Sequence, residues 1–398
     1  MEFRKLKKDE INRSIEMSEF AFQYELSDEE REDRLKWIVP EETWVASEKG
    51  ELLSKVTVMP FHVYIDGQAY AMGGVSGVAT WPEKRRSGLV RTLLGMSLEE
   101  MKRNGQTVSF LHPFSVPFYR KFGWEMFAWK RTVDIPREKL PARKSVSGSV
   151  ERVKKDPAIL GPVYDQWASR YNATIRRTDE WWERSIFKRK KGHAAVYRNG
   201  EGTIRGYIIY TVKEETMTVK ELVHLDADAR NGLWNFISNH DSMIENAELT
   251  LPGDDSTMLM LDDPDAEQTV IPYFMARIVD VKPFLEQYTA EKALTEPVIL
   301  HIDDAFCNWN TGTYILKPDS EENGVLVEHY AGASEGSSCA HPPKRGLSMD
   351  IQTLSAAVLN AHPAQLLYTE ERILGTREEL ERFKSLVSDR PAYFYDFF

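Results

Sequence analysis

The residues best suited to chemistry lie where an expected strand turns into an expected helix. Residues 74–80 are rich in β-forming side chains and are followed by Trp81-Pro82, which predicts a strand that ends there. Apolar residues at helical spacing predict a helix from about residue 89 to Gly105. The first N–H groups of a helix lack intrahelical partners, so the basic turn between these elements, Arg85-Arg86-Ser87-Gly88, is suited to bind a diphosphate. By itself the pattern also fits an ordinary basic helix start.

A second group of chemically notable residues is at the end of the chain. Five of the last six residues, Tyr393 to Phe398, are aromatic, whereas free C-termini are normally frayed and polar. So much apolar area predicts a buried terminus. Burial would raise the pKa of the Phe398 α-carboxylate from about 3.5 and make it a better base toward an ammonium group. The alternative is hydrophobic docking of the tail with a solvated carboxylate.

The composition is that of a folded protein with several domains. The 398 residues are 42% hydrophobic and carry a net charge of −11, which argues against a nucleic-acid partner and favours cationic small molecules. Cys307 and Cys339 offer no disulfide framework, and no Cys/His cluster has zinc spacing, so no metal is expected. We find no signal peptide and no apolar run of membrane-spanning length, and therefore expect a cytoplasmic protein without membrane contact.

Three successive units are expected to position these residues, with boundaries at 1–145, 146–280 and 281–398. In the first, two acidic helical turns around Asp28 precede strands at 43–46 and 52–60 and a hairpin at 61–70 that turns at Asp66-Gly67. Residues 136–158 predict a linker into the second unit. That unit has strands at 194–198, 206–212 and 216–223, and the third has a mixed pattern with a polar loop at 331–345.

The second unit repeats the element order of the first but lacks its basic turn. At the equivalent place the sequence runs from Asp226 to Trp234 and contains two carboxylates that would repel a diphosphate. Trp234 also stands where a small residue is required. We therefore expect the second copy to be structural and the first turn to be the only binding site of this kind.

The run Pro82-x-x-Arg85-x-x-Gly88-x-Val90 resembles the pyrophosphate loop of the GCN5-related N-acetyltransferases (GNAT), Arg/Gln-x-x-Gly-x-Gly/Ala, with Val90 as a departure. About thirty residues later, Phe118-Tyr119-Arg120-Lys121-Phe122-Gly123-Trp124 resembles a second GNAT signature. Over its whole length the chain is similar to the Eis (enhanced intracellular survival) branch of this superfamily. The implied fold class is α+β, with two tandem GNAT-like domains, the second degenerate, followed by a sterol-carrier-like α/β domain.

The resemblance implies an N-acetyltransferase that uses acetyl-CoA to acetylate primary amines of small polycations such as aminoglycosides, or lysine amines. Tyr119 would be the general acid for the CoA thiolate and the Phe398 carboxylate the general base; the alternative for Tyr119 is a buried packing residue. The residues expected to bind the cosubstrate are Val78, Ala79, Thr80, Arg85, Arg86, Ser87, Gly88, Val90 and Arg91.

Acidic residues near the expected site are candidates to bind a cationic acceptor. They are Asp28, Glu29, Glu30 and Asp396, although acids at a helix start also stabilise the helix dipole. No histidine has pair or triad spacing, and His112 is the one nearest to the site. The resemblance further implies a homo-oligomer, a hexamer. A different class of function stays open: a protein that binds an apolar ligand in its sterol-carrier-like domain and has a non-catalytic GNAT unit.

Overall fold

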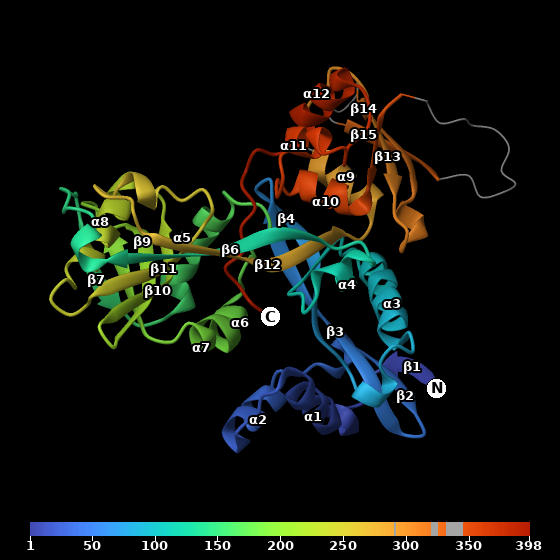
Figure 1. The fold of residues 1–398 in the computed structure, drawn as a ribbon, viewed down its shortest axis with the longest axis horizontal. Helices are drawn as coiled ribbons and strands as arrows, with labels where there is room; N and C mark the ends of the chain where they lie inside the picture. Colours follow the sequence, from blue (N-terminus) through green and yellow to red (C-terminus); the bar gives the residue numbers. More distant parts are fainter. Residues whose placement is uncertain (290–291, 320–324, 332–344) are drawn as a thin grey trace, which may run out of the picture.

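The computed structural model describes residues 1–289, 292–319, 325–331 and 345–398. Two sheets organise these residues, a long one of 12 strands in the order β1-β2-β3-β4-β5-β12-β6-β11-β10-β9-β8-β7 and a separate one of four strands. Figure 1 shows the long sheet running through two units, while the four-stranded sheet lies with its helices beside the first unit. The predicted α+β class is confirmed.

The first unit contains the strand, turn and helix expected to bind the diphosphate. Its elements are β1 (Glu2–Lys5), α1 (Ile11–Phe22), α2 (Asp28–Leu35), β2 (Thr43–Glu48), β3 (Glu51–Ile65), β4 (Gln68–Thr80), α3 (Leu89–Arg103), β5 (Val108–Leu111), α4 (Val116–Arg120) and β6 (Glu125–Pro136). The hairpin turn is where it was predicted, with positive φ at Asp66 (51°) and Gly67 (83°). The strand predicted at 52–60 and the first arm of the hairpin predicted at 61–70 are one strand, because β3 continues through Pro60, an exposed residue that lies opposite Gly73 of β4.

The second unit repeats the arrangement of the first. Its elements are β7 (Ser149–Val153), α5 (Pro157–Ala168), α6 (Asp179–Trp181), α7 (Phe187–Arg189), β8 (His193–Arg198), β9 (Ile204–Lys213), β10 (Thr216–His224), α8 (Ala227–Ser238), β11 (Asn246–Leu251) and β12 (Glu267–Ile278). The stretch 136–158 is not only a linker as we expected, because Ser149–Val153 forms a strand antiparallel to β8.

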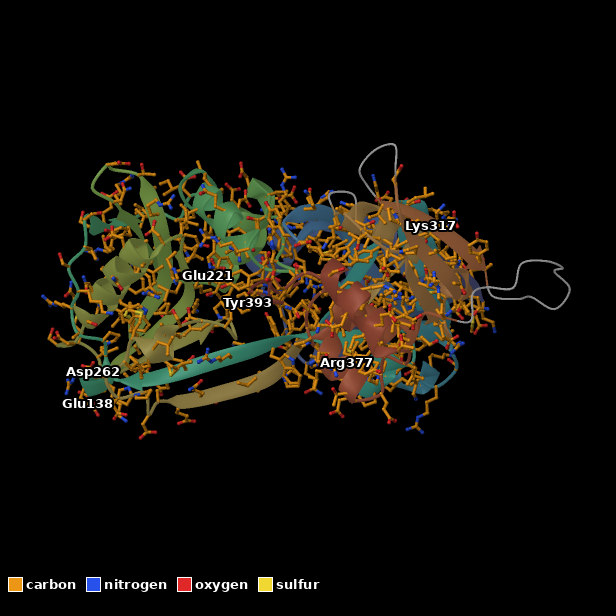
Figure 2. All side chains as sticks on the ribbon, turned by 90° about the horizontal axis from the view of Figure 1, so that it is seen from above. Glu138, Glu221, Asp262, Lys317, Arg377 and Tyr393 are labelled. Carbon is orange, nitrogen blue, oxygen red and sulfur yellow. The ribbon has the colours of Figure 1, made fainter. Side chains whose placement is uncertain are left out.

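Two long strands belong to both units. The end of β12 pairs with β5 of the first unit, with Met275 opposite Leu111, while β6 pairs with β11 of the second unit, with Leu249 opposite Val133. The two strands also pair with each other. Figure 2 shows them as a ribbon that crosses from one unit to the other. The part of the long sheet that belongs to the first unit is therefore completed by β12, which begins more than 130 residues after β6 ends.

The third unit packs helices against its own sheet, ordered β15-β14-β13-β16. Its elements are α9 (Val281–Thr289), β13 (Val298–Asp303), β14 (Gly312–Pro318), β15 (Val325–Ala331), β16 (Leu347–Asp350), α10 (Ile351–Val358), α11 (Ala364–Thr369) and α12 (Arg377–Leu386). Most of the expected polar loop at 331–345, and Cys339 with it, lies outside the described residues. In the described part of the chain no helix is long and apolar enough to cross a membrane.

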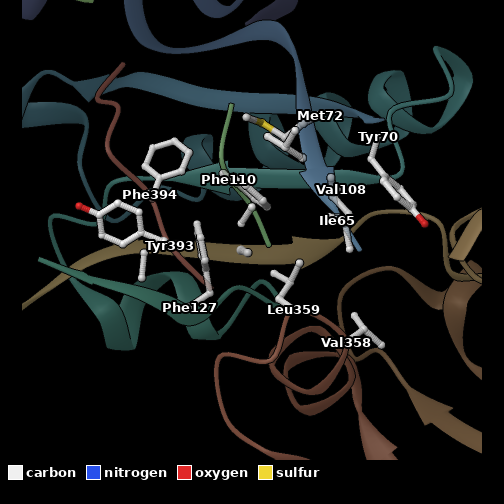
Figure 3. Close-up of a cluster of buried hydrophobic side chains, with 14 of the residues drawn as sticks. Ile65, Tyr70, Met72, Val108, Phe110, Phe127, Val358, Leu359, Tyr393 and Phe394 are labelled. Atoms are coloured by element: carbon white, nitrogen blue, oxygen red, sulfur yellow. The ribbon is translucent and has the colours of Figure 1, made fainter. Parts of the chain in front are cut away.

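The C-terminal tail is packed where the units meet (Figure 1). Tyr393, Phe394, Tyr395 and Phe398 are between 2% and 8% exposed, which confirms the predicted burial of the aromatic end. Figure 3 shows Tyr393 and Phe394 beside Phe110 and Phe127 of the first unit. These residues share one hydrophobic cluster with Val358 and Leu359 of the third unit.

Candidate functional site

The central feature of the site is a strand that loses its neighbour. β4 pairs with β5 only from Met72 to Val75, because β5 ends at Leu111, opposite Val75. On its other side β4 carries a bulge, since Lys55 pairs with Ala79 and Thr57 with Ser76, and Gly77 adopts φ 56° there. The backbone of residues 76–80 therefore presents an open edge, where N–H and C=O groups are available to a ligand.

The turn after β4 presents further N–H groups. Arg86 and Gly88 have positive φ, 63° and 82°, and Gly88 is the residue before the first turn of α3. No atom lies within 4 Å of where a Cβ on Gly88 would be, so this position needs glycine for its backbone conformation and not for space. Arg85 and Arg86 are exposed residues of this turn. A helix start with such donors is suited to bind a diphosphate.

The strand edge and the turn line one cavity of about 570 Å³. All nine residues predicted to bind the cosubstrate contribute to its wall, namely Val78, Ala79, Thr80, Arg85, Arg86, Ser87, Gly88, Val90 and Arg91. Sequence reasoning missed Ala21 and Phe22 of α1 and the apolar wall of Phe114, Phe118 and Phe122. It also missed Lys84, although the basic run that continues through Arg86 was a usable signal.

Tyr119 lies directly behind this apolar wall. The centroid of its ring is 5.4 Å from that of Phe114 and 5.1 Å from that of Phe118, and the residue is only 2% exposed. Among the described residues the Tyr119 hydroxyl has no hydrogen-bond partner, and it is not one of the fully buried polar atoms that lack one. Burial raises the pKa of Tyr119 above its usual range, which keeps the phenol protonated.

Phe398 packs against β4 just before the bulge. Its ring centroid is 5.0 Å from that of Phe61, and its ring is so close to Gly74 that a Cβ there would be 2.9 Å from it. Ser185 donates a hydrogen bond to the Phe397 carbonyl (3.5 Å) and Tyr273 donates one to the Asp396 carbonyl (2.7 Å). The last residue of the chain is therefore placed against the same strand whose open edge begins two residues later.

His112 lies between the end of β5 and the tail. The centroid of its ring is 5.0 Å from that of Phe397 and 5.5 Å from that of Phe274. Desolvation by these rings lowers the pKa of His112, so the imidazole is neutral near pH 7.

The predicted acidic residues do not form one group. Asp28 and Glu29 are exposed in the first turn of α2, where Ser27 and Glu30 form a capping box. Asp396 is different, because its side chain is 0% exposed and accepts hydrogen bonds from Arg177 and Trp181. The Asp396 carboxylate is thus occupied by protein donors.

The second unit has lost the open helix start. Asp226 caps α8 and accepts a hydrogen bond from the Ala229 N–H (2.8 Å), while Asp228 accepts from Ser147 (2.6 Å) and from Tyr197. Carboxylates of the chain itself therefore occupy the place where the first unit offers free donors. Trp234 belongs to the same helix, and its side chain is buried in the hydrophobic core of the second unit.

Comparisons with known proteins define the class. The family model of the GNAT acetyltransferase domain matches residues 2–127, a second model with the same description matches residues 173–278, and that of the sterol carrier protein domain matches residues 281–395. In this organisation, two GNAT domains followed by a sterol carrier protein domain, the chain is Eis-like.

Curated relatives carry the same class of name. An uncharacterized N-acetyltransferase of Streptomyces griseus is 27% identical over 252 residues, which are 56% of this chain and 61% of the relative. The N-acetyltransferase Eis of Mycobacterium tuberculosis is 24% identical over 233 residues, 55% of this chain and 58% of the relative. The matched region thus spans 61% and 58% of the length of these relatives.

Solved structures match the whole chain. A conserved protein of unknown function from Enterococcus faecalis, described as a probable N-acyltransferase, has a TM-score of 0.88 and 28% identity and covers 100% of this chain and 99% of its own. Eis1 from Mycobacterium abscessus has a TM-score of 0.79 and 17% identity, with 100% of both chains covered, and it shares the fold.

Proposed function

We propose that the protein is an N-acetyltransferase that moves the acetyl group of acetyl-CoA to a primary amine. The observation that carries the proposal is the cavity between the open edge of β4 and the start of α3, where a strand edge, a helix start and four cationic side chains meet. The N–H groups of the turn and Arg85 and Arg86 would hold the diphosphate. The open backbone of residues 78–80 would pair with the amide groups of the pantetheine arm.

The reaction needs one proton acceptor and one proton donor. The amine nitrogen attacks the thioester carbonyl, the C–S bond breaks, and the amine loses one proton while the CoA sulfur gains one. We assign the first proton to the Phe398 carboxylate and the second to the Tyr119 hydroxyl. The acetyl group passes directly to the amine, so no covalent intermediate on the protein is required.

The raised pKa of Tyr119 bears on this assignment. Sequence reasoning alone set a phenol of pKa about 10 against a thiol of about 8.5, a donation that is uphill by about 2 kcal/mol. Burial raises the pKa of Tyr119 further. The leaving thiolate would form behind the same apolar wall, where desolvation raises its proton affinity as well, so the two effects offset each other.

For the acceptor we propose a small polycation such as an aminoglycoside, or a lysine amine. Asp28 and Glu29 support this choice because their exposed carboxylates are not tied up in described ion pairs. Asp396 is fully paired inside the protein, and we assign it to the tail and not to the substrate.

The test is thiol release from acetyl-CoA in the presence of a panel of aminoglycosides, polyamines and lysine peptides. Turnover with at least one amine, lost in Tyr119→Phe, supports the proposal. Absence of turnover together with saturable binding of an apolar ligand by the intact protein would favour the alternative function, an apolar-ligand-binding protein of the sterol-carrier type.

A further inference from the structure

A buried cluster of charges lies in the second unit, outside the proposed cosubstrate cavity. Its members are Arg177, Lys190, Glu221 and Asp396, and the side chains of Arg177, Glu221 and Asp396 are all 0% exposed. Arg177 Nη2 is 2.5 Å from Glu221 Oε1 and 3.0 Å from Asp396 Oδ2, and Lys190 pairs with Glu221. Figure 2 shows Glu221 and Tyr393 close together where the second unit faces the first.

The net charge of the cluster is zero only when the C-terminal tail is in place. It contains two cations and two anions, and one anion, Asp396, belongs to the C-terminal tail. Neutral donors complete the arrangement, since Tyr207 donates to Glu221 (2.6 Å) and Trp181 to Asp396 (2.8 Å). Without the tail, a net positive charge would stay buried, which is strongly unfavourable. The seated tail is therefore favoured over a free one.

The loop that carries Arg177 is itself fixed to the first unit. Tyr64 of β3 donates its N–H to the Thr174 carbonyl (2.9 Å), and Ile175 forms a bridge with Val63. On its other side the loop holds the tail, because Tyr393 donates its N–H to the Asn172 carbonyl (2.9 Å). β3, the Arg177 loop and the tail thus follow one another in a line of backbone contacts.

Only two residues separate this cluster from the chain end. Lys190 donates to the Tyr395 carbonyl (3.1 Å), so the backbone is held before Asp396 as well as after it. With Asp396 anchored, Phe398 can reach only a small region, and this region is against Gly74 of β4.

We propose that the second GNAT unit serves as a socket for the chain terminus, in which Arg177 holds Asp396 and thereby places the Phe398 carboxylate beside the open edge of β4. The catalytic consequence rests on the proposed function, and Arg177 and Asp396 act in it as positioning residues. The socket gives the unit a role after the loss of its own binding turn.

The test compares Asp396→Asn with Glu221→Gln in the full chain. Both variants remove one fully buried carboxylate from Arg177 and leave the same net charge in the cluster, so Glu221→Gln reports the structural effect alone. The first readout is release of Phe398 and Phe397 by carboxypeptidase, followed by mass spectrometry. The second is kcat and the KM for acetyl-CoA with an accepted amine, and the third is the melting temperature.

We expect Asp396→Asn to release Phe398 at least about tenfold faster than wild type, because a lost buried pair raises the population of the open tail. Its kcat should fall by about tenfold or more with an unchanged KM for acetyl-CoA. Glu221→Gln should lower the melting temperature similarly but keep the wild-type release rate. Wild-type protection of the tail in Asp396→Asn, or equal release in both variants, would overturn the socket.

Two features keep the test decisive. If wild type turns over no amine, the proposed function fails, while the release rates still decide the socket. If Asp396→Asn does not fold, Arg177→Lys replaces it, because a lysine keeps the charge but loses the forked contact with Asp396. Faster release of Phe398 than in wild type then supports the socket, and a wild-type rate refutes it.

Discussion

Tyr119 and Phe398 lie on opposite faces of the sheet at the place where β4 and β5 separate. Gly74 faces Phe398, whereas its neighbours Gly73 and Val75 face the cluster under α3 to which Tyr119 belongs. Successive residues of a strand point to opposite faces, so the open strand edge lies between the two side chains. This arrangement supports attack by an amine from one face and departure of the thiolate toward the other.

Replacement of Tyr119 by phenylalanine tests the donor on one face. We expect kcat to fall by about 10² to 10⁴, the usual worth of general acid–base catalysis, with unchanged affinity for acetyl-CoA. Thiol release and calorimetric titration measure these two quantities. Tyr314→Phe is the control, because it removes an equally buried hydroxyl that bonds Asn310 in the third unit (2.9 Å). Equal activity of both variants would remove the acid role.

A short extension after Phe398 tests the proton acceptor proposed on the other face of the sheet. Phe398 is 8% exposed and its ring fills the space against Gly74, so added residues must displace the carboxylate. We expect turnover to be lost while the far-ultraviolet circular dichroism spectrum is retained. The same extension placed before Met1, which is 62% exposed, should leave turnover intact. An active C-terminally extended protein would contradict the base assignment.

Gly88→Ala tests the diphosphate site through its backbone. With φ at 82° and open space around it, an added Cβ strains the turn by about 1 kcal/mol without a clash. We expect weaker binding of acetyl-CoA, by about tenfold, as the N–H groups shift. Gly105→Ala is a matched control, since Gly105 has φ 70° and open space at the far end of α3. Calorimetry on both variants decides, and equal affinities would argue against the turn as the site.

Lys55 gives the protein a pH-dependent stability. Burial lowers its pKa to about 7, and its ammonium group donates hydrogen bonds to Ser14 and Ser18 oxygens. Between pH 7 and about 10.5 the unfolded chain binds the proton more strongly than the folded protein, so the free energy of unfolding rises with pH, by about 1.4 kcal/mol per unit at most. Urea unfolding at pH 7.5 and 9 should show this slope in wild type and in the exposed-site control Lys213→Met. It should shrink in Lys55→Met, and an unchanged slope there would refute the assignment.

The contact between the third unit and the α4 region depends on a buried ion pair. Arg277 Nη2 is 2.6 Å from Asp304 Oδ2, both side chains are 0% exposed, and Arg277 also donates to the Phe122 carbonyl. Asp304→Asn should lower the free energy of unfolding by about 3 kcal/mol, because an uncompensated charge stays buried. Asp303→Asn, one residue away and exposed, should change it by less than about 0.5 kcal/mol. Similar urea midpoints for the two variants would contradict the expectation.

Local chemistry made the cosubstrate turn predictable from the sequence. The positive charges, the glycine and the helix start are neighbours in the chain, so all nine predicted residues meet at one cavity. The aromatic tail was equally informative, because apolar area must be buried wherever it occurs. The three unit boundaries stay predictions, since β6 and β12 each belong to two units.

Features that depend on distant partners escaped prediction. The residues next to Asp396 in the sequence do not show whether its carboxylate binds a substrate or pairs with another side chain. Its partner Arg177 is 219 residues away. The crossing of β6 and β12 was missed for the same reason, because neither strand was predicted and each pairs with segments far away in the sequence. The segments predicted separately at 52–60 and 61–70 join in β3, because a proline breaks a strand only where its missing N–H is needed, and β3 continues through Pro60 opposite Gly73.

The late arrival of β12 has a consequence for biosynthesis. A nascent chain that has just emerged with residues 1–145 still lacks the strand that must pair with β5. The amino-terminal unit therefore cannot complete its sheet until β12 (Glu267–Ile278) has also been translated, unlike domains that fold one after another. A product terminated before β12 would therefore lack the strand that completes the sheet carrying the candidate site.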